Sequence, residues 1–157
     1  QYGDSTRADY PAVQVDRVLH DGDTVSLGDN VLVARLTPGH TKGCTTWTMR
    51  VPTQSGTREV VIVGSPNVNP GYRLFGNSKY PNIRADFERT FVVLRSLKAD
   101  IFLGAHGSYF ELAAKYERRR RGDRDAFVDP SGYARFVADG ERAFIRERAA
   151  QRRASRN

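Results

Sequence analysis

The chain has 157 residues, of which 39% are hydrophobic and 27% charged, and its formal net charge at pH 7 is +7. This length suits one domain with a packed core, and the hydrophobic fraction excludes an intrinsically disordered chain. The sequence holds no run of about 18 apolar residues, the length that crosses a bilayer. We therefore expect one folded domain with no membrane as partner.

Predicted strands dominate residues 13–65. Apolar and polar residues alternate in several short runs separated by Gly, Asp and Asn, which is typical of strands joined by turns. Two of these runs flank the turn sequence GDN at 28–30, so we expect a hairpin there. The run VVIV is apolar throughout, as in a strand buried on both faces. The predicted strands cover residues 13–19, 25–27, 31–36, 44–51 and 60–63.

The pattern changes to helical spacing after residue 71. Apolar residues three and four positions apart predict a helix that starts after Asn82, a residue type that caps helices well. Asp129 followed by Pro130 offers a second cap, with proline in the first helical position. The expected elements are a helix starting near residue 82, a buried strand over 100–104, and helices over 108–121 and 130–148.

The order of these elements predicts the fold class. A strand-rich segment over 13–65 precedes an α-β-α-α segment over 82–150 and a basic tail over 149–157. Amphipathic helices bury their apolar faces against a sheet, so we expect the helices to pack on one side of it. The prediction is an α+β or layered α/β fold.

The positive charge is concentrated near the C-terminus. From Lys115 to Asn157 there are 13 Lys and Arg residues against 7 Asp and Glu. A basic segment can bind nucleic acid, but here aromatic residues are not interleaved and acidic residues alternate with the arginines, which is typical of a solvated helix surface. We therefore expect the run Arg118–Arg121 to face solvent and do not expect nucleic acid as a partner.

Two of the three histidines lie where predicted strands end. His40 belongs to the turn sequence TPGH, and His106 lies between an alanine and a glycine. Small neighbours leave space for an ion or a substrate, and neutral imidazole is the commonest metal ligand. The spacing alone leaves a metal site and a structural role equally open for these two residues. His20, in the sequence LHDG, is interpreted as part of an ordinary turn.

Two histidines do not complete a catalytic zinc site, which usually needs three protein ligands and an open position. The sequence contains no HxH, HExxH or CxxC pair, and its one cysteine is Cys44. Any zinc site that uses this chain is therefore half of one.

Three longer segments are recognisable. TPGHTKGCTTWTM, then VNPGYRLFGNSKYPNIRADFERTF, then SLKADIFLGAHGSYFELAAKY closely resemble the C-terminal half of subclass B3 metallo-β-lactamases. The resemblance runs from about Val15 to Tyr116. The TPGHT turn is shared by many hydrolases of the metallo-β-lactamase fold, whereas the second and third segments narrow the resemblance to this subclass. It implies an αβ/βα sandwich, of which residues 1–157 form one half: a β-sheet with flanking helices.

The resemblance also implies two zinc ions. His40 matches the third histidine on the first zinc, and His106 matches the last histidine on the second. In the family the other ligands come from an HxHxDH loop in the N-terminal half, which is absent here. The implied activity is opening of the β-lactam ring of penicillins, cephalosporins or carbapenems by zinc-bound hydroxide, with both histidines as ligands and neither as a general base. Thr41 and Thr45 are candidates for orienting them.

The loop SPNVN at 65–69 matches a family loop that often reads STSVN and contacts the substrate carboxylate. The resemblance thus makes Ser65 and Asn67 substrate-binding candidates. Pro66 and Asn67 depart from the family pattern, but an Asn amide can still donate to a carboxylate. A role in shaping the turn is the alternative for both.

We expect the partners to be a small-molecule β-lactam and the missing N-terminal half of the same domain, and we expect this chain alone to be inactive. By resemblance, the full-length protein is periplasmic or secreted and acts in antibiotic resistance. The alternatives are another hydrolase of this fold, such as a lactonase or thioesterase, a non-catalytic fragment, or a basic module that binds nucleic acid.

Overall fold

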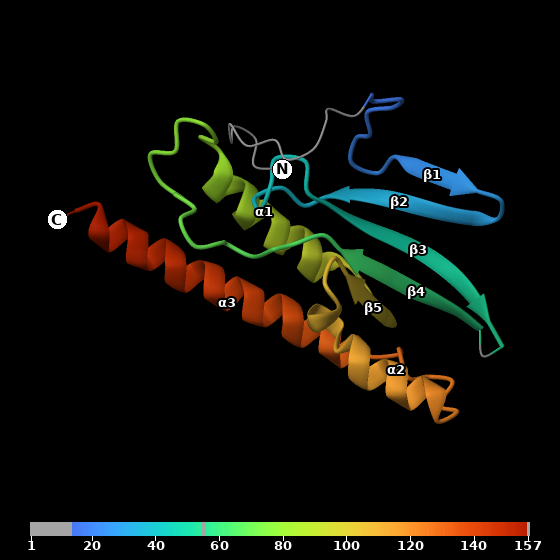
Figure 1. Ribbon diagram of the computed structural model, residues 1–157. Helices are drawn as coiled ribbons and strands as arrows, with labels where there is room; N and C mark the ends of the chain where they lie inside the picture. The colour runs from blue at the N-terminus through green and yellow to red at the C-terminus, as the bar shows by residue number, and fades with distance from the viewer. Residues whose placement is uncertain (1–13, 55, 157) are drawn as a thin grey trace.

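The computed structural model describes residues 14–54 and 56–156 (Figure 1). This part of the chain folds into one five-stranded sheet with three α-helices and one 3-10 helix, η1. The strands are β1 Thr24–Leu27, β2 Asn30–Leu36, β3 Thr45–Thr53, β4 Gly56–Val63 and β5 Ile101–Gly104. The helices are α1 Ile83–Ser96, η1 Gly107–Phe110, α2 Leu112–Arg120 and α3 Pro130–Ala154. None of the helices in the described ranges is long and apolar enough to cross a membrane.

The sheet follows chain order from β1 to β5. Strands β1 to β4 form an antiparallel meander, and the predicted hairpin is confirmed: β1 pairs with β2 around a turn in which Gly28 has φ +57°, a value that favours glycine. Strand β5 lies parallel to β4, with Val63 opposite Gly104. The connection between these two strands contains α1. It brings the ends of β4 and β5 to the same edge of the sheet.

Helices α1 and α3 pack against each other and against one face of the sheet (Figure 1). Phe144 of α3 stacks on Phe87 and Phe91 of α1, with ring centroids 5.5 Å and 5.7 Å apart. The sheet contributes Val61 and Val63 to the same core. Each fully buried ring contributes about 2–3 kcal/mol to stability, so this cluster holds the two helices firmly against the sheet.

The opposite face of the sheet stays half-exposed. Trp47 and Ile62 lie directly across from each other on β3 and β4, and Met49 follows on the same face of β3. These side chains alternate with those that meet the helices, and they lie outside the core cluster of the described residues. The fold class predicted from the sequence is confirmed, with one apolar sheet face left uncovered by the described helices.

The prediction of a first strand over residues 13–19 was wrong for the described residues. Residues 14–19 form no strand, and residue 13 lies outside the described residues. Val15 and Val18 are 68% and 71% exposed, so their alternation with polar residues does not reflect a buried sheet face. The helix predicted to start after Asn82 is confirmed: α1 begins at Ile83 with Asn82 at the N-cap position, although the Asn82 side chain makes no capping hydrogen bond.

The helix predicted over 108–121 is broken in two. Glu111, between η1 and α2, has φ +56°, a left-handed conformation that no continuous α-helix contains. The last helix extends to Ala154, so most of the segment predicted as a basic tail is helical. The run Arg118–Arg121 is exposed, as expected.

A buried ion pair joins α2 to the start of α3. Lys115 is 3% exposed, and its Nζ lies 2.9 Å from Oδ2 of Asp129. The other carboxylate oxygen accepts a hydrogen bond from the Gly132 amide at 2.7 Å, which confirms Asp129 as the helix cap. Burial by itself raises the pKa of Asp129, but the ion pair with Lys115 and the hydrogen bond from Gly132 outweigh it and hold that pKa below its usual value.

Candidate metal and substrate site

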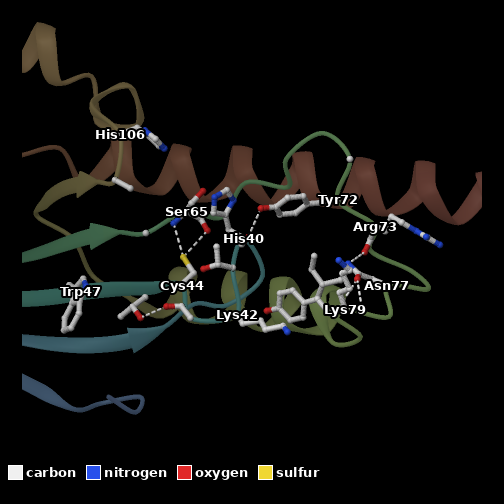
Figure 2. A pocket seen from close by; sticks show the side chains of 18 residues that line it. His40, Lys42, Cys44, Trp47, Ser65, Tyr72, Arg73, Asn77, Lys79 and His106 are labelled. Atoms are coloured by element: carbon white, nitrogen blue, oxygen red, sulfur yellow. Dashed lines mark hydrogen bonds between the residues drawn. The ribbon is translucent and has the colours of Figure 1, made fainter. Parts of the chain in front are cut away.

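A cleft of about 1170 Å³ lies at the edge of the sheet where β4 and β5 end (Figure 2). His40 and His106, the two histidines singled out from the sequence, both line it. His40 belongs to the loop between β2 and β3, and His106 follows β5 after one intervening residue. His20 lies before β1, where its backbone amide donates to Asp23 Oδ2 at 2.7 Å. The structure thus brings together the two predicted histidines and keeps the third in a turn.

The turn that carries His40 is anchored on α1. Gly39 has φ +132°, and a Cβ at this position would lie 2.7 Å from Cγ of Phe87. The ring of Phe87 therefore packs directly against the glycine backbone. Beside it, the Thr90 hydroxyl donates to the Pro38 carbonyl oxygen at 2.6 Å. These contacts explain why a glycine precedes the histidine.

The His40 imidazole has a fixed tautomer. Its Nδ1 lies 2.8 Å from the backbone carbonyl oxygen of Asn67. Because a carbonyl oxygen only accepts hydrogen bonds, Nδ1 carries the proton, and Nε2 of the neutral ring keeps a lone pair. A backbone carbonyl is one of the usual hydrogen-bond partners of a metal-binding histidine, together with a carboxylate or water. Thr45 does not orient this ring, since its hydroxyl donates to the Gly43 carbonyl oxygen.

His106 is exposed and immediately precedes η1, at its N-cap position. The ring of Tyr109 meets it edge-on, with centroids 5.0 Å apart. Within the described ranges no hydrogen bond fixes the His106 ring, so both of its nitrogens remain open to the cleft or to solvent. The Tyr109 ring also packs closely against Gly104, since a Cβ on Gly104 would lie 3.0 Å from this ring.

Ser65 and Asn67, the predicted substrate contacts, share Tyr109 as a partner. The Ser65 hydroxyl lies 3.1 Å from the Tyr109 hydroxyl, and Nδ2 of Asn67 donates to the same oxygen at 3.0 Å. Ser65 is only 6% exposed, whereas Asn67 is exposed. An amide has two N–H groups, so Asn67 keeps one for a ligand. Ser65 is held as part of the loop, and Asn67 presents the accessible donor.

Cys44 supports the loop that carries Ser65 and Asn67. Its Sγ accepts a hydrogen bond from the Ser65 amide at 3.3 Å, and burial raises the pKa of the thiol. The group is therefore a neutral thiol at pH 7 when no metal ion is bound. A Cβ on Gly64 would lie 2.7 Å from this sulfur, so the loop needs glycine at that point.

The charged side chains that line the cleft are all cationic in the described ranges: Lys42, Arg73 and Lys79. The Nζ of Lys42 lies over the Tyr80 ring, 5.6 Å from its centroid. A cleft lined by one sign of charge attracts ligands of the opposite sign. The arrangement favours a small anionic molecule.

Sequence reasoning missed two aromatic residues of the site. Tyr109 joins the Ser65–Asn67 loop to the His106 loop, and the Tyr72 hydroxyl donates to the His40 carbonyl oxygen at 2.9 Å (Figure 2). Both lie inside the segments NPGY and GAHGSYF, which carried the resemblance, so the residues were noticed but their roles were not.

The described residues contain no group of three or more His, Cys, Asp and Glu side chains that could hold a metal ion. The two histidines fit zinc by chemistry and by the His40 tautomer, yet they leave most of the coordination to residues outside the described chain. The described residues therefore do not complete a metal site by themselves.

No family model matches the chain. Among solved structures, it is similar to the FEZ-1 metallo-β-lactamase from Legionella gormanii, with 44% identity and a TM-score of 0.89 over 91% of this chain and 55% of that one. A metallo-β-lactamase from Cronobacter sakazakii with a HARLDQ motif gives 39% identity and a TM-score of 0.83 over 91% and 54% of the two chains.

BJP-1, a subclass B3 metallo-β-lactamase of Bradyrhizobium japonicum, gives 35% identity and a TM-score of 0.87 over 97% of this chain and 58% of that one. The chain thus spans little more than half the length of these relatives. The resemblance inferred from the sequence is confirmed: the chain has a partial metallo-β-lactamase fold of the subclass B3 type, about one half of the complete domain.

Proposed function

We propose that this chain is the part of a zinc-dependent β-lactam hydrolase that supplies one histidine to each of two zinc ions. His40 is the ligand of the first zinc and His106 the ligand of the second. The observation that carries the proposal is the hydrogen bond from Nδ1 of His40 to the Asn67 carbonyl oxygen, because it leaves Nε2 as the metal-binding atom in a cleft that His106 also lines.

The remaining ligands come from the half of the domain that the relatives contain and this chain lacks. That half packs on this chain's apolar sheet face, which includes Trp47, Met49 and Ile62. Sheets pack face to face about 10 Å apart through such residues. We infer that the chain without this half binds zinc weakly and does not hydrolyse β-lactams.

When bound, zinc lowers the pKa of water to about 7 and polarises a carbonyl group. The residues of this chain orient the substrate. The free N–H of Asn67 donates to the substrate carboxylate, while Ser65 and Tyr109 hold that amide in place. Lys42, Arg73 and Lys79 raise the local concentration of the anionic substrate.

The proposed substrates are penicillins, cephalosporins or carbapenems, all small molecules with a carboxylate. The proposed setting of the full-length protein is the periplasm or the outside of the cell, with a role in antibiotic resistance. The proposed substrates, location and role rest on the family alone. The substrate proposal is tested by measuring β-lactam hydrolysis.

The test uses the full-length protein that contains this chain, with zinc content measured by mass spectrometry and turnover measured with the chromogenic cephalosporin nitrocefin. We expect two zinc ions per parent protein. His40→Ala and His106→Ala should each lose about one zinc and at least a hundredfold in kcat/KM, since each removes a metal ligand. His20→Ala is the matched control, because His20 lies before β1 and outside the cleft, and it should retain both ions and full turnover.

Two results would overturn the proposal. If His40→Ala and His106→Ala kept the parent's zinc content, the ligand assignment would be wrong. If the parent bound zinc but opened a lactone or thioester and left nitrocefin intact, the metal site would stand and the β-lactam assignment would fall.

A further inference from the structure

The side chain of Gln151, in the last turns of α3, bonds the backbone of a distant loop at two points. Its Nε2 donates to the Tyr72 carbonyl oxygen at 2.7 Å, and its Oε1 accepts from the Leu74 amide at 2.7 Å. The second N–H of the same amide donates to Glu147 at 2.8 Å. The side chain therefore pairs with two alternate backbone groups, as a neighbouring β-strand would.

The loop that Gln151 holds forms one wall of the cleft. Between residues 65 and 79 the structure records a single backbone-backbone hydrogen bond within the described residues, from the Tyr72 amide to the Asn69 carbonyl oxygen at 3.1 Å. Side chains add to this support. Leu74, 2% exposed, anchors it in the core directly beside the Gln151 contact.

The same loop reaches His40 from two directions. The Tyr72 hydroxyl donates to the His40 carbonyl oxygen at 2.9 Å, and the two rings lie 5.9 Å apart. Upstream, the Asn67 carbonyl oxygen accepts from the His40 imidazole. A shift of the 72–74 backbone therefore moves a group that contacts His40.

Helix α3 is rigidly placed where Gln151 projects from it. One and two turns earlier along the helix, Arg148 donates to Glu88 of α1 at 2.8 Å and Phe144 stacks on Phe87. Phe87 is also the ring beneath Gly39 in the His40 turn. The helix pair thus supports the His40 turn and the opposite wall of the cleft from the same base.

We propose that Gln151 is a positioning residue of the cleft: its amide fixes the 72–74 backbone, and through the Tyr72 hydroxyl it fixes the placement of His40. The effect on zinc rests on the proposed function of His40, whereas the effect on the loop does not. The segment 149–157 thereby gains a role in the site, although its composition indicates only a basic tail.

The experiment replaces Gln151 with methionine, which is nearly isosteric and favours helix but makes no hydrogen bonds. Amide hydrogen exchange is followed by NMR in the full-length protein, and zinc affinity is measured by competition with a chelator. Arg152→Met, at the exposed neighbouring position, is the matched control. Tyr72→Phe and the double variant Gln151→Met with Tyr72→Phe complete a double-mutant cycle.

In Gln151→Met we expect the Leu74 amide to exchange roughly tenfold faster, because its acceptor and the neighbouring bond are both lost. Zinc affinity should fall about fivefold, less than the loss of a direct orienting partner. In the Tyr72→Phe background the same change should lower zinc affinity by less than twofold, since the path to His40 is already broken. Arg152→Met should leave both quantities at the parent values.

Unchanged exchange of the Leu74 amide in Gln151→Met would show that Gln151 does not fix the 72–74 backbone (the clamp), whether or not the protein binds zinc. Faster exchange with unchanged zinc affinity would overturn the positioning role while leaving the clamp in place. A parent protein that binds no zinc would instead refute the proposed function, and the exchange of Leu74 would still decide on the clamp.

Discussion

Replacing Gly39 by alanine tests how the cleft is built, because two separate costs meet at this residue. The backbone has φ +132°, a conformation that residues with a Cβ rarely adopt, and the added Cβ would lie 2.7 Å from Cγ and 2.8 Å from Cδ1 of Phe87. Phe87 is fully buried between Phe144 and the turn, so its ring has little room to withdraw. Gly71→Ala serves as the comparison, since Gly71 has φ +85° but nothing within 4 Å of its Cβ.

The magnitudes separate the two variants. A residue forced into such a backbone region costs on the order of 1–3 kcal/mol. Overpacking a core by one methyl group costs about 1–3 kcal/mol more. We expect Gly71→Ala to lower the free energy of unfolding by about 1–2 kcal/mol through strain alone. Gly39→Ala should lower it by about 3–4 kcal/mol and should also displace His40.

Urea unfolding of the full-length protein measures both variants. The double variant Gly39→Ala with Phe87→Leu decides the cause, because a smaller side chain relieves the clash and leaves the strain. We expect the two changes together to cost at least about 1 kcal/mol less than the sum of the single variants. If Gly39→Ala destabilised the protein no more than Gly71→Ala, or if the two changes were additive, the contact with Phe87 would not constrain the turn.

Three further changes probe the supports around the site. Asp129→Asn should cost about 2–4 kcal/mol at pH 7, since it leaves Lys115 buried without its partner. The depressed pKa of Asp129 contributes stability that is fully present above its unfolded-state value near 3.8 and is lost as the pH falls through the lower folded-state value. Urea midpoints of parent and variant should therefore converge below about pH 4, and a constant gap down to pH 2 would contradict the assignment. Thr90→Val should lower the free energy of unfolding by about 1–2 kcal/mol in urea, because it leaves the Pro38 carbonyl oxygen without its donor. Tyr109→Phe should raise KM for nitrocefin about threefold with kcat nearly unchanged, and an unaltered KM would show that Asn67 is not held by this hydroxyl.

Local sequence patterns predicted the parts of the fold whose causes are local. The hairpin follows from a glycine-containing turn between two alternating runs, and Asp129 caps α3 because a short carboxylate reaches the amide three residues ahead. The buried run VVIV became the end of β4, paired on both sides by β3 and β5. The resemblance to a known family supplied the fold as a whole.

The errors arise where distant contacts or single backbone angles decide. Residues 14–19 alternate like a strand, but exposed valines gain nothing from pairing, so the pattern alone was insufficient. A glutamate at position 111 does not indicate a left-handed backbone in the sequence, yet this one residue separates η1 from α2. α3 continues through an arginine-rich segment, since polar residues do not end a helix without a breaker such as glycine or proline.

In the candidate site, too, local features could be predicted from the sequence and distant contacts could not. His40 and His106 stand out in the sequence because small residues flank them, whereas the group that orients His40 is a backbone carbonyl 27 residues away, which every residue type possesses and no sequence pattern marks. The Asn67–Tyr109 bond spans 42 residues and the Gln151–Tyr72 bond spans 79. A candidate ligand can therefore be recognised in the sequence by its residue type. The partners that fix its tautomer and position cannot, because they depend on which loops the fold brings together. The proposed half-site therefore depends on the packing of α1 and α3 as much as on its two imidazoles, and we expect changes at Phe87 or Gln151 to alter metal binding without replacing a proposed ligand.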